Sequence, residues 1–212
     1  MREITQLRAG EDRRKQKVKV FLDDRYAFSL DTEVIVKENL QVGQELSNGR
    51  IEALVKSDQF HRCYNVASRY LSYRPRSESE IRGRLQQRGF DGEFIEAVVA
   101  KLMEQGLVDD FAFAQFWKDN RESFSPRSQR LTKLELRRKG INGDIIEQVI
   151  EEVDDVDSAY RAALKKVRLR PLVDYQSFRR WLGEYLRRRG FSYDVINSTV
   201  ERIWQEQGNS SG

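Results

Sequence analysis

The pattern of apolar positions divides the chain into a short N-terminal part with strand-like runs and a longer part with helical spacing. Residues 18–22 and 26–30 are two runs rich in β-branched and aromatic side chains, and Asp23, Asp24 and Arg25 separate them. Short runs of this kind across a polar turn predict a β-hairpin. Residues 4–7 are expected to add a third strand.

The same N-terminal part ends in helical signals. Asp31 is placed to cap a short helix that ends near Asn39, and a turn at residues 42–43 precedes a second helix from about Asn48. Residues 1–55 contain ten Lys and Arg and ten Asp and Glu, so this head is electrically neutral. We expect a small α+β unit that covers the apolar end of the helices that follow it.

Beyond residue 60 one pattern occurs three times. Residues 82–95, 133–146 and 183–196 align at offsets of 51 and 50 residues, with Leu, a basic residue, Gly, a bulky apolar residue, a small polar residue and Ile at matching positions. Repetition at this period indicates a tandem array of supersecondary units. We therefore expect three repeats of about 50 residues each.

Each repeat has the signals of three helices. An amphipathic helix ends at a basic residue, and the glycine that follows suits the left-handed position after a helix. A small polar residue then caps the next helix, which carries an apolar stripe at helical spacing. The expected caps are Asp91, Asn142 and Ser192. A further helix precedes each pair, at residues 66–73, 111–120 and 156–167.

The expected fold class is mainly α. We expect three tandem three-helix repeats in an elongated, curved array, with a small N-terminal β-containing (α+β) head. The expected divisions are 1–55 for the head, 56–106, 107–155 and 156–207 for the repeats, and 208–212 for a disordered tail. Aromatic residues at helical spacing, such as Trp117 and Trp181, are expected to pack in the repeat cores.

Composition limits the chemistry that the chain can perform. Cys63 is the only cysteine and His61 the only histidine, and no Cys/His cluster has the spacing of zinc ligands. No phosphate-binding glycine loop occurs, and most carboxylates lie on charged helix faces, where water ordinarily solvates them. We therefore expect no enzyme, no catalytic residue, no metal and no cofactor.

No apolar run approaches the roughly 20 residues that a membrane helix requires, and the first ten residues lack the pattern of a signal peptide. A single cysteine also forms no internal disulfide. We expect a reduced, cytoplasmic monomer that does not bind membranes.

Positive charge recurs at equivalent positions of the repeats. The chain has 38 Lys and Arg against 34 Asp and Glu, and the excess of four falls on residues 56–212. Arg130 and Arg137 are seven residues apart, as are Arg180 and Arg187, so each pair leaves one face of its helix. The offset of 50 residues between the pairs predicts a basic track along the second and third repeats.

Arg82 and Lys133 are expected to extend this track sideways. The track predicts an anionic partner, and the alternative is a solvated face balanced by neighbouring Glu. Arg88, Lys139 and Arg189 have a structural explanation instead, because a cation at a helix C-terminus is favoured by about 0.3 to 1 kcal/mol.

Three segments resemble the bacterial RecX family of regulatory proteins. They are residues 71–81 (LSYRPRSESEI) leading to Arg88-Gly89-Phe90, residues 106–114 (GLVDDFAFA) and residues 135–141 (ELRRKGI). The resemblance covers about residues 60–207. In the first segment, Ser77 and Glu80 also have the spacing of a capping box.

The resemblance implies a non-enzymatic regulator that binds the RecA filament on single-stranded DNA. It implies inhibition of RecA ATPase and strand exchange, with effects on DNA repair, recombination and the SOS response. Family members have no residue motif for chemistry, so only the basic positions are carried over. The alternative is a tandem helix-turn-helix-like protein that binds DNA directly, but its recognition helix would be the second of each pair, which is acidic here.

Overall fold

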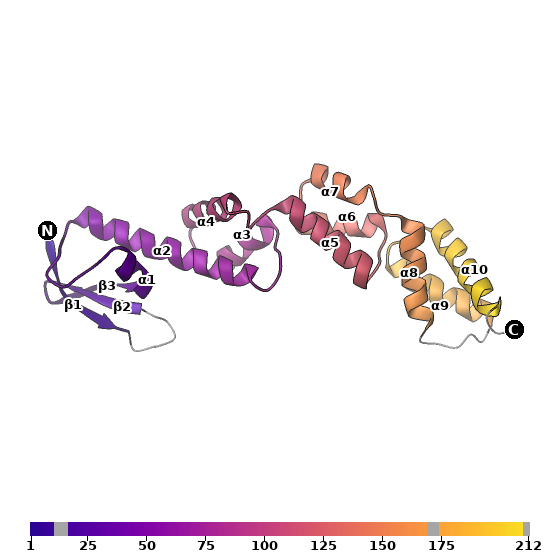
Figure 1. Cartoon of the computed structure of the whole chain (residues 1–212), viewed down its shortest axis with the longest axis horizontal. Helices are drawn as coiled ribbons and strands as arrows, with labels where there is room; N and C mark the ends of the chain where they lie inside the picture. Colours follow the sequence, from indigo (N-terminus) through magenta and orange to yellow (C-terminus); the bar gives the residue numbers. More distant parts are fainter. Residues whose placement is uncertain (11–16, 169–173, 210–212) are drawn as a thin grey trace. The chain divides into compact units, whose positions relative to one another are not determined.

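The computed structural model describes residues 1–10, 17–168 and 174–209 (Figure 1). The chain divides into two compact units. The first comprises Met1–Arg74 and Ile81–Leu107, and the second comprises Pro75–Glu80 and Val108–Gly212. The head and most of the first repeat therefore form one unit, and the second and third repeats belong to the other.

The head is built on a four-stranded antiparallel sheet in the order β3-β2-β1-β4. Its strands are β1 (Arg2–Ala9), β2 (Lys17–Leu22), β3 (Arg25–Asp31) and β4 (Glu45–Leu46). β2 and β3 form the predicted hairpin, and β1 confirms the predicted third strand.

The hairpin turn consists of Asp23 and Asp24, whose φ angles of 49° and 63° are left-handed, as tight hairpin turns require. The Asp23 carboxylate accepts hydrogen bonds from the N–H of Glu3 at 3.0 Å and from Nε of Arg2 at 3.1 Å. These two bonds lower the pKa of Asp23. The turn is thereby tied to β1.

Two helices complete the head. Helix α1 (Thr32–Lys37) begins at Asp31, whose side chain accepts a hydrogen bond from the N–H of Glu33, as predicted for a cap. Helix α2 (Asn48–Leu71) begins where predicted but continues for 24 residues. It crosses residues 55 and 56 without a break, because no glycine or proline lies between Arg50 and Leu71. The helix expected at 66–73 is the last part of α2.

The other predicted helices are all present. They are α3 (Glu78–Gln87), α4 (Gly92–Glu104), α5 (Asp110–Phe124), α6 (Gln129–Arg138), α7 (Gly143–Ile150), α8 (Asp155–Val167), α9 (Tyr175–Arg188) and α10 (Tyr193–Asn209). The second repeat is α5 to α7 and the third is α8 to α10 (Figure 1). Leu85, Leu136 and Leu186 are fully buried, so the repeated leucines are core residues.

The predicted caps of the third helices are present, two of them with a side-chain hydrogen bond. Asn142 accepts a hydrogen bond from the N–H of Asp144 at 2.9 Å, and Ser192 accepts one from the N–H of Val195 at 3.4 Å. Asp91 is the N-cap of α4 by its extended backbone conformation and makes no side-chain cap hydrogen bond.

Helix α10 continues through residue 209, so the predicted tail 208–212 was wrong for its first two residues. The rest of that tail, 210–212, lies outside the described residues.

In the described parts of the chain, no helix combines the length and apolarity that crossing a membrane requires. Within the same ranges, no group of three His, Cys, Asp or Glu is arranged to hold a metal ion.

A joint between successive repeats occurs twice in the second unit. Ser77 Oγ donates a hydrogen bond of 2.7 Å to the carbonyl oxygen of Lys139. At the matching place one repeat later, the Ser128 N–H donates a hydrogen bond of 3.0 Å to the carbonyl oxygen of Arg189. In both cases the start of one repeat's second helix meets the end of the next repeat's second helix.

Carboxylates strengthen the same joints. Asp110 accepts a hydrogen bond of 2.8 Å from the N–H of Glu78, and Asp155 accepts one of 2.7 Å from the N–H of Gln129. Each acid begins the first helix of a repeat and satisfies the first N–H of the preceding repeat's second helix. Burial raises the pKa of both carboxyls, and the hydrogen bonds oppose this in part.

Candidate functional site

Two of the three cations at the predicted helix ends, Lys139 and Arg189, are engaged within the fold, whereas Arg88 is exposed. Lys139 Nζ lies 2.6 Å from Glu80 Oε1 and 5.0 Å from the ring centre of Trp117. The Arg189 guanidinium lies 4.1 Å from the ring centre of Tyr185.

The capping box predicted from Ser77 and Glu80 is confirmed, because the N–H of Glu80 donates to Ser77 Oγ at 3.2 Å and the N–H of Ser77 donates to Glu80 Oε2 at 3.4 Å.

A second group of arginines is held by a largely buried carboxylate. Glu135 accepts hydrogen bonds from Trp117 Nε1 at 2.9 Å and from Arg121 Nε at 2.8 Å, and it also pairs with Arg127. Burial lowers the pKa of both guanidinium groups. These two arginines therefore stabilise the second repeat and are engaged there.

The four arginines of the predicted track differ from these groups. Arg130 and Arg137 are exposed on α6, and Arg180 and Arg187 are exposed on α9. None of the four makes a side-chain hydrogen bond or an ion pair with any residue that the structure describes. Their positive charges are not neutralised by close contacts and are available to an anionic partner.

Arg82 and Lys133 are paired within their own repeats. Arg82 Nη2 lies 3.0 Å from Glu96 Oε2, and Lys133 pairs with Glu147. Both pairs join the second helix of a repeat to its third helix, at positions offset by 51 residues. Because each cation faces a carboxylate, it adds less to an anion-binding surface than the four unpaired arginines do.

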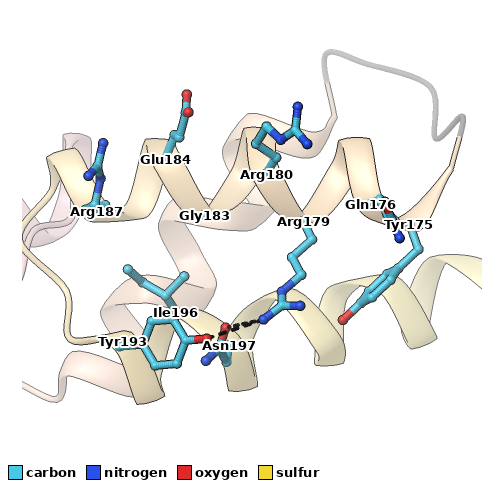
Figure 2. A pocket seen from close by; sticks show the side chains of 10 residues that line it. All are labelled: Tyr175, Gln176, Arg179, Arg180, Gly183, Glu184, Arg187, Tyr193, Ile196 and Asn197. Carbon is cyan, nitrogen blue, oxygen red and sulfur yellow. Dashed lines mark hydrogen bonds between the residues drawn. The ribbon is translucent and has the colours of Figure 1, made fainter.

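The third repeat has different residues at these two positions. The 51- and 50-residue offsets place Gly183 where the first two repeats have Arg82 and Lys133, and Asn197 where they have glutamates. A groove of about 500 Å³ lies between α9 and α10 at this place (Figure 2). Its lining residues are Tyr175, Gln176, Arg179, Arg180, Gly183, Glu184, Arg187, Tyr193, Ile196 and Asn197.

The side chains of the groove fall into two sets. In Figure 2, Arg180, Glu184 and Arg187 extend from the same side of α9, whereas Arg179 extends toward α10. Arg179 Nη2 lies 3.5 Å from the hydroxyl of Tyr193 and 3.5 Å from Asn197 Oδ1. These distances are at the outer limit for a hydrogen bond, so a ligand can compete for this guanidinium.

Two residues of the predicted track, Arg180 and Arg187, therefore lie in a groove, beside three residues that the sequence analysis did not select. The missed residues are Arg179, Tyr193 and Asn197. A signal for them is present in the aligned repeats, because the acid at the position of Asn197 is lost in the same repeat that loses the cation.

His61, the only histidine, lies in the first unit and lines a separate hollow of about 400 Å³ together with Ser57. Its Nε2 is 2.7 Å from Glu33 Oε2, and its Nδ1 is 3.3 Å from Asn65 Nδ2. Both ring nitrogens therefore have partners other than the Ser57 hydroxyl. This arrangement does not place the imidazole as a base for a serine nucleophile.

Comparisons with known proteins agree with this architecture. Residues 2–47 match the family described as Regulatory protein RecX N-terminal domain, and residues 63–102 match RecX, first three-helix domain. The regulatory protein RecX of Bacillus pumilus is 29% identical over 207 residues, which cover 96% of this chain and 78% of that protein. The protein of that name from Clostridium perfringens is 28% identical over 91% of this chain and 92% of its own length.

A solved structure of a RecX protein is also similar to this chain. The crystal structure of a regulatory protein RecX is similar over 95% of this chain and 100% of its own, with a TM-score of 0.65 and 26% sequence identity. The similarity includes both the sheet-containing head and the helical repeats, since it covers nearly the whole chain.

Proposed function

Because this chain belongs to the RecX family of regulatory proteins, a family not known as enzymatic, we propose that it binds the RecA filament on single-stranded DNA and inhibits it. Inhibition applies to the ATPase and to the recombinase activity of the filament. The consequence for the cell is control of DNA repair, recombination and the SOS response.

The observation that carries this proposal is the set of unpaired arginines on α6 and α9. Four exposed guanidinium groups occur at equivalent positions of two successive repeats, whereas Lys133 pairs with Glu147 and Arg121 with Glu135. A surface of this kind attracts a polyanion, and nucleoprotein filaments are polyanions. The acidic character of α4 and α7 argues against insertion of these helices into the major groove of DNA.

The proposal is tested by measuring ATP hydrolysis by RecA on single-stranded DNA at rising concentrations of this protein. We expect hydrolysis to fall at concentrations of this protein too low to cover the strand. Inhibition that appears only when the protein suffices to cover the strand would mean that the protein only sequesters DNA, as the helix-turn-helix alternative requires. No change in hydrolysis at any concentration would contradict the proposal.

A further inference from the structure

We infer that the groove between α9 and α10 is a binding site for single-stranded nucleic acid, with phosphates on its arginines and a base against Tyr193. The inference rests on the proposed function, because it assigns one of the two anionic components of the filament to a defined site. The other component, the RecA protein surface, is assigned to Arg130 and Arg137 on α6.

The groove lies where the third repeat differs from the first two. In the first two repeats an ion pair joins the second helix to the third helix. The third repeat replaces the cation with Gly183 and the acid with Asn197, so neither the pair nor its negative charge is present. A Cβ atom at position 183 would lie 3.6 Å from Ile196 Cγ2, which is ordinary contact. Packing therefore does not demand glycine here, and the missing side chain leaves room for a ligand.

The lining of the groove carries more positive than negative charge. Arg179, Arg180 and Arg187 line the groove against the single carboxylate of Glu184. Arg180 and Arg187 are separated by about 10 Å along the helix axis, and Glu184 extends between them (Figure 2). A carboxylate at this place disfavours one small anion held by both arginines. Separate phosphates of one strand fit the arrangement better.

The lining of the groove includes an exposed aromatic ring. Tyr193 is 70% exposed, so its ring is accessible to a ligand in the groove. The equivalent residues of the first two repeats are Gly92 and Gly143, so the ring is specific to the repeat that has the groove. Exposed rings beside arginines are the usual platform for bases of a single strand.

A nucleic acid fits this groove better than an acidic polypeptide does. Carboxylates of a peptide would engage the arginines but would leave the exposed ring of Tyr193 and the amide of Asn197 without a role. A nucleotide uses both, because its base stacks on a ring and its edge accepts and donates hydrogen bonds. Arg179, which contacts both side chains only at 3.5 Å, is free to turn to a phosphate.

The test uses the full chain, without RecA, and a fluorescently labelled oligothymidylate whose anisotropy reports binding. The main variant, Gly183→Lys with Asn197→Glu, installs the pair of the second repeat in the third. A lysine is a better helix residue than glycine, so this variant should fold. We expect its affinity for the oligonucleotide to fall at least about tenfold, and Tyr193→Ala to weaken binding by about fivefold or more.

The matched control is Lys133→Gly with Glu147→Asn, which removes the pair from the second repeat. This variant should bind the oligonucleotide as the unchanged protein does, and circular dichroism should show that all variants are folded. Equal binding by the unchanged protein and the main variant would overturn the inference. So would displacement of the oligonucleotide by polyglutamate at lower concentration than by unlabelled strand, since that result indicates a polypeptide partner.

RecA inhibition is measured in parallel and keeps the two proposals distinguishable. A protein that inhibits RecA but binds no oligonucleotide contradicts the groove and supports the proposed function. A protein that binds the oligonucleotide in the groove but leaves RecA hydrolysis unchanged supports the groove and contradicts the proposed function.

Discussion

Ser77 Oγ donates a hydrogen bond of 2.7 Å to the carbonyl oxygen of Lys139, a residue 62 positions further along the chain. The last carbonyl groups of a helix have no partner within the helix, so this bond satisfies a group that would otherwise need water. Ser128 and Arg189 make the corresponding contact one repeat later. The repeats are thus joined through the ends of their second helices.

The glycines that follow these carbonyls should be indispensable. Gly140 and Gly190 have φ angles of 80° and 89°. A Cβ atom at Gly190 would lie 2.8 Å from Leu131 Cβ, and one at Gly140 would lie 2.7 Å from Ser79 Oγ. We expect Gly190→Ala to lower the free energy of unfolding by about 2 to 4 kcal/mol, from the left-handed backbone and the forced shift together.

Gly89→Ala is the matched control for this prediction. Gly89 has a φ of 78° but no atom within 4 Å of the Cβ position, so only the backbone cost of about 1 to 2 kcal/mol applies. All three tryptophans of the chain, at 117, 181 and 204, belong to the second unit, so their fluorescence during urea unfolding reports that unit. Gly190→Ala should shift this transition and Gly89→Ala should not. A loss of stability in Gly190→Ala no larger than this backbone cost would show that the close approach is unimportant.

The stability of the second unit should depend on the ionisation of Asp155. Burial raises its pKa above the ordinary value of 3.8, with a further contribution from the Asp154 charge, while the Gln129 N–H opposes the rise. The folded state therefore binds the proton more tightly than the unfolded state. This contribution to stability is complete below about pH 3.8 and is lost as the pH rises through the raised pKa.

Asp155→Asn should remove this pH dependence and keep the acceptor for the Gln129 N–H. We expect its free energy of unfolding at pH 7 to equal or exceed that of the unchanged protein. Asp155→Ala, which leaves the N–H without an acceptor, should cost about 1 kcal/mol at every pH. Tryptophan-detected urea unfolding between pH 3.5 and pH 7 checks both variants. If the free energy of unfolding of Asp155→Asn depends on pH as steeply as that of the unchanged protein, another group is responsible for this dependence.

Cys63 should be unreactive in the folded protein. Its side chain is fully buried, and burial raises the pKa of the thiol to about 11. Thiol reagents react with the thiolate, so labelling at pH 8 requires opening of the first unit. The labelling rate should rise steeply with urea and should increase in Gly89→Ala but not in Gly190→Ala. Labelling in native buffer as fast as a free cysteine peptide would contradict the burial.

Much of this fold was predictable because it repeats. Leu85, Leu136 and Leu186 recur with the same flanking pattern, and a pattern found three times is independent of the helix propensity of any one segment. The continuous α2 was not predicted, since a helix that packs first on the sheet through Leu54 and then on α4 through Cys63 changes partners without a break in its own sequence.

The site was less predictable than the fold. Helical spacing correctly indicated that Arg180 and Arg187 share a face, but it does not show whether a cation meets a carboxylate from another helix. Arg82 and Lys133 meet Glu96 and Glu147, which are 14 residues further along in each case. Such pairs depend on how two helices pack against each other, and only the structure gives that.

Cations at helix ends should matter for stability more than for binding. Lys139 pairs with Glu80, and Arg189 contacts Tyr185. We expect each change in the combined variant Arg88→Glu, Lys139→Glu and Arg189→Glu to lower the free energy of unfolding by about 1 kcal/mol. All three changes remove a favourable charge from a helix C-terminus, and those at Lys139 and Arg189 also remove cation–ring contacts. Circular dichroism at rising temperature measures this loss. RecA inhibition, measured at a temperature where the variant is folded, should remain close to that of the unchanged protein.

The most direct measurement of the central claim is the inhibition of RecA ATP hydrolysis by a variant with Arg130, Arg137, Arg180 and Arg187 all changed to Glu. These four side chains are exposed and make no ion pair with the rest of the described chain, so the variant should unfold at the same temperature as the unchanged protein. We expect that this variant no longer inhibits RecA at any concentration at which the unchanged protein does. Full inhibition by the folded variant would show that these arginines are only a solvated face and that the contact with the filament lies elsewhere.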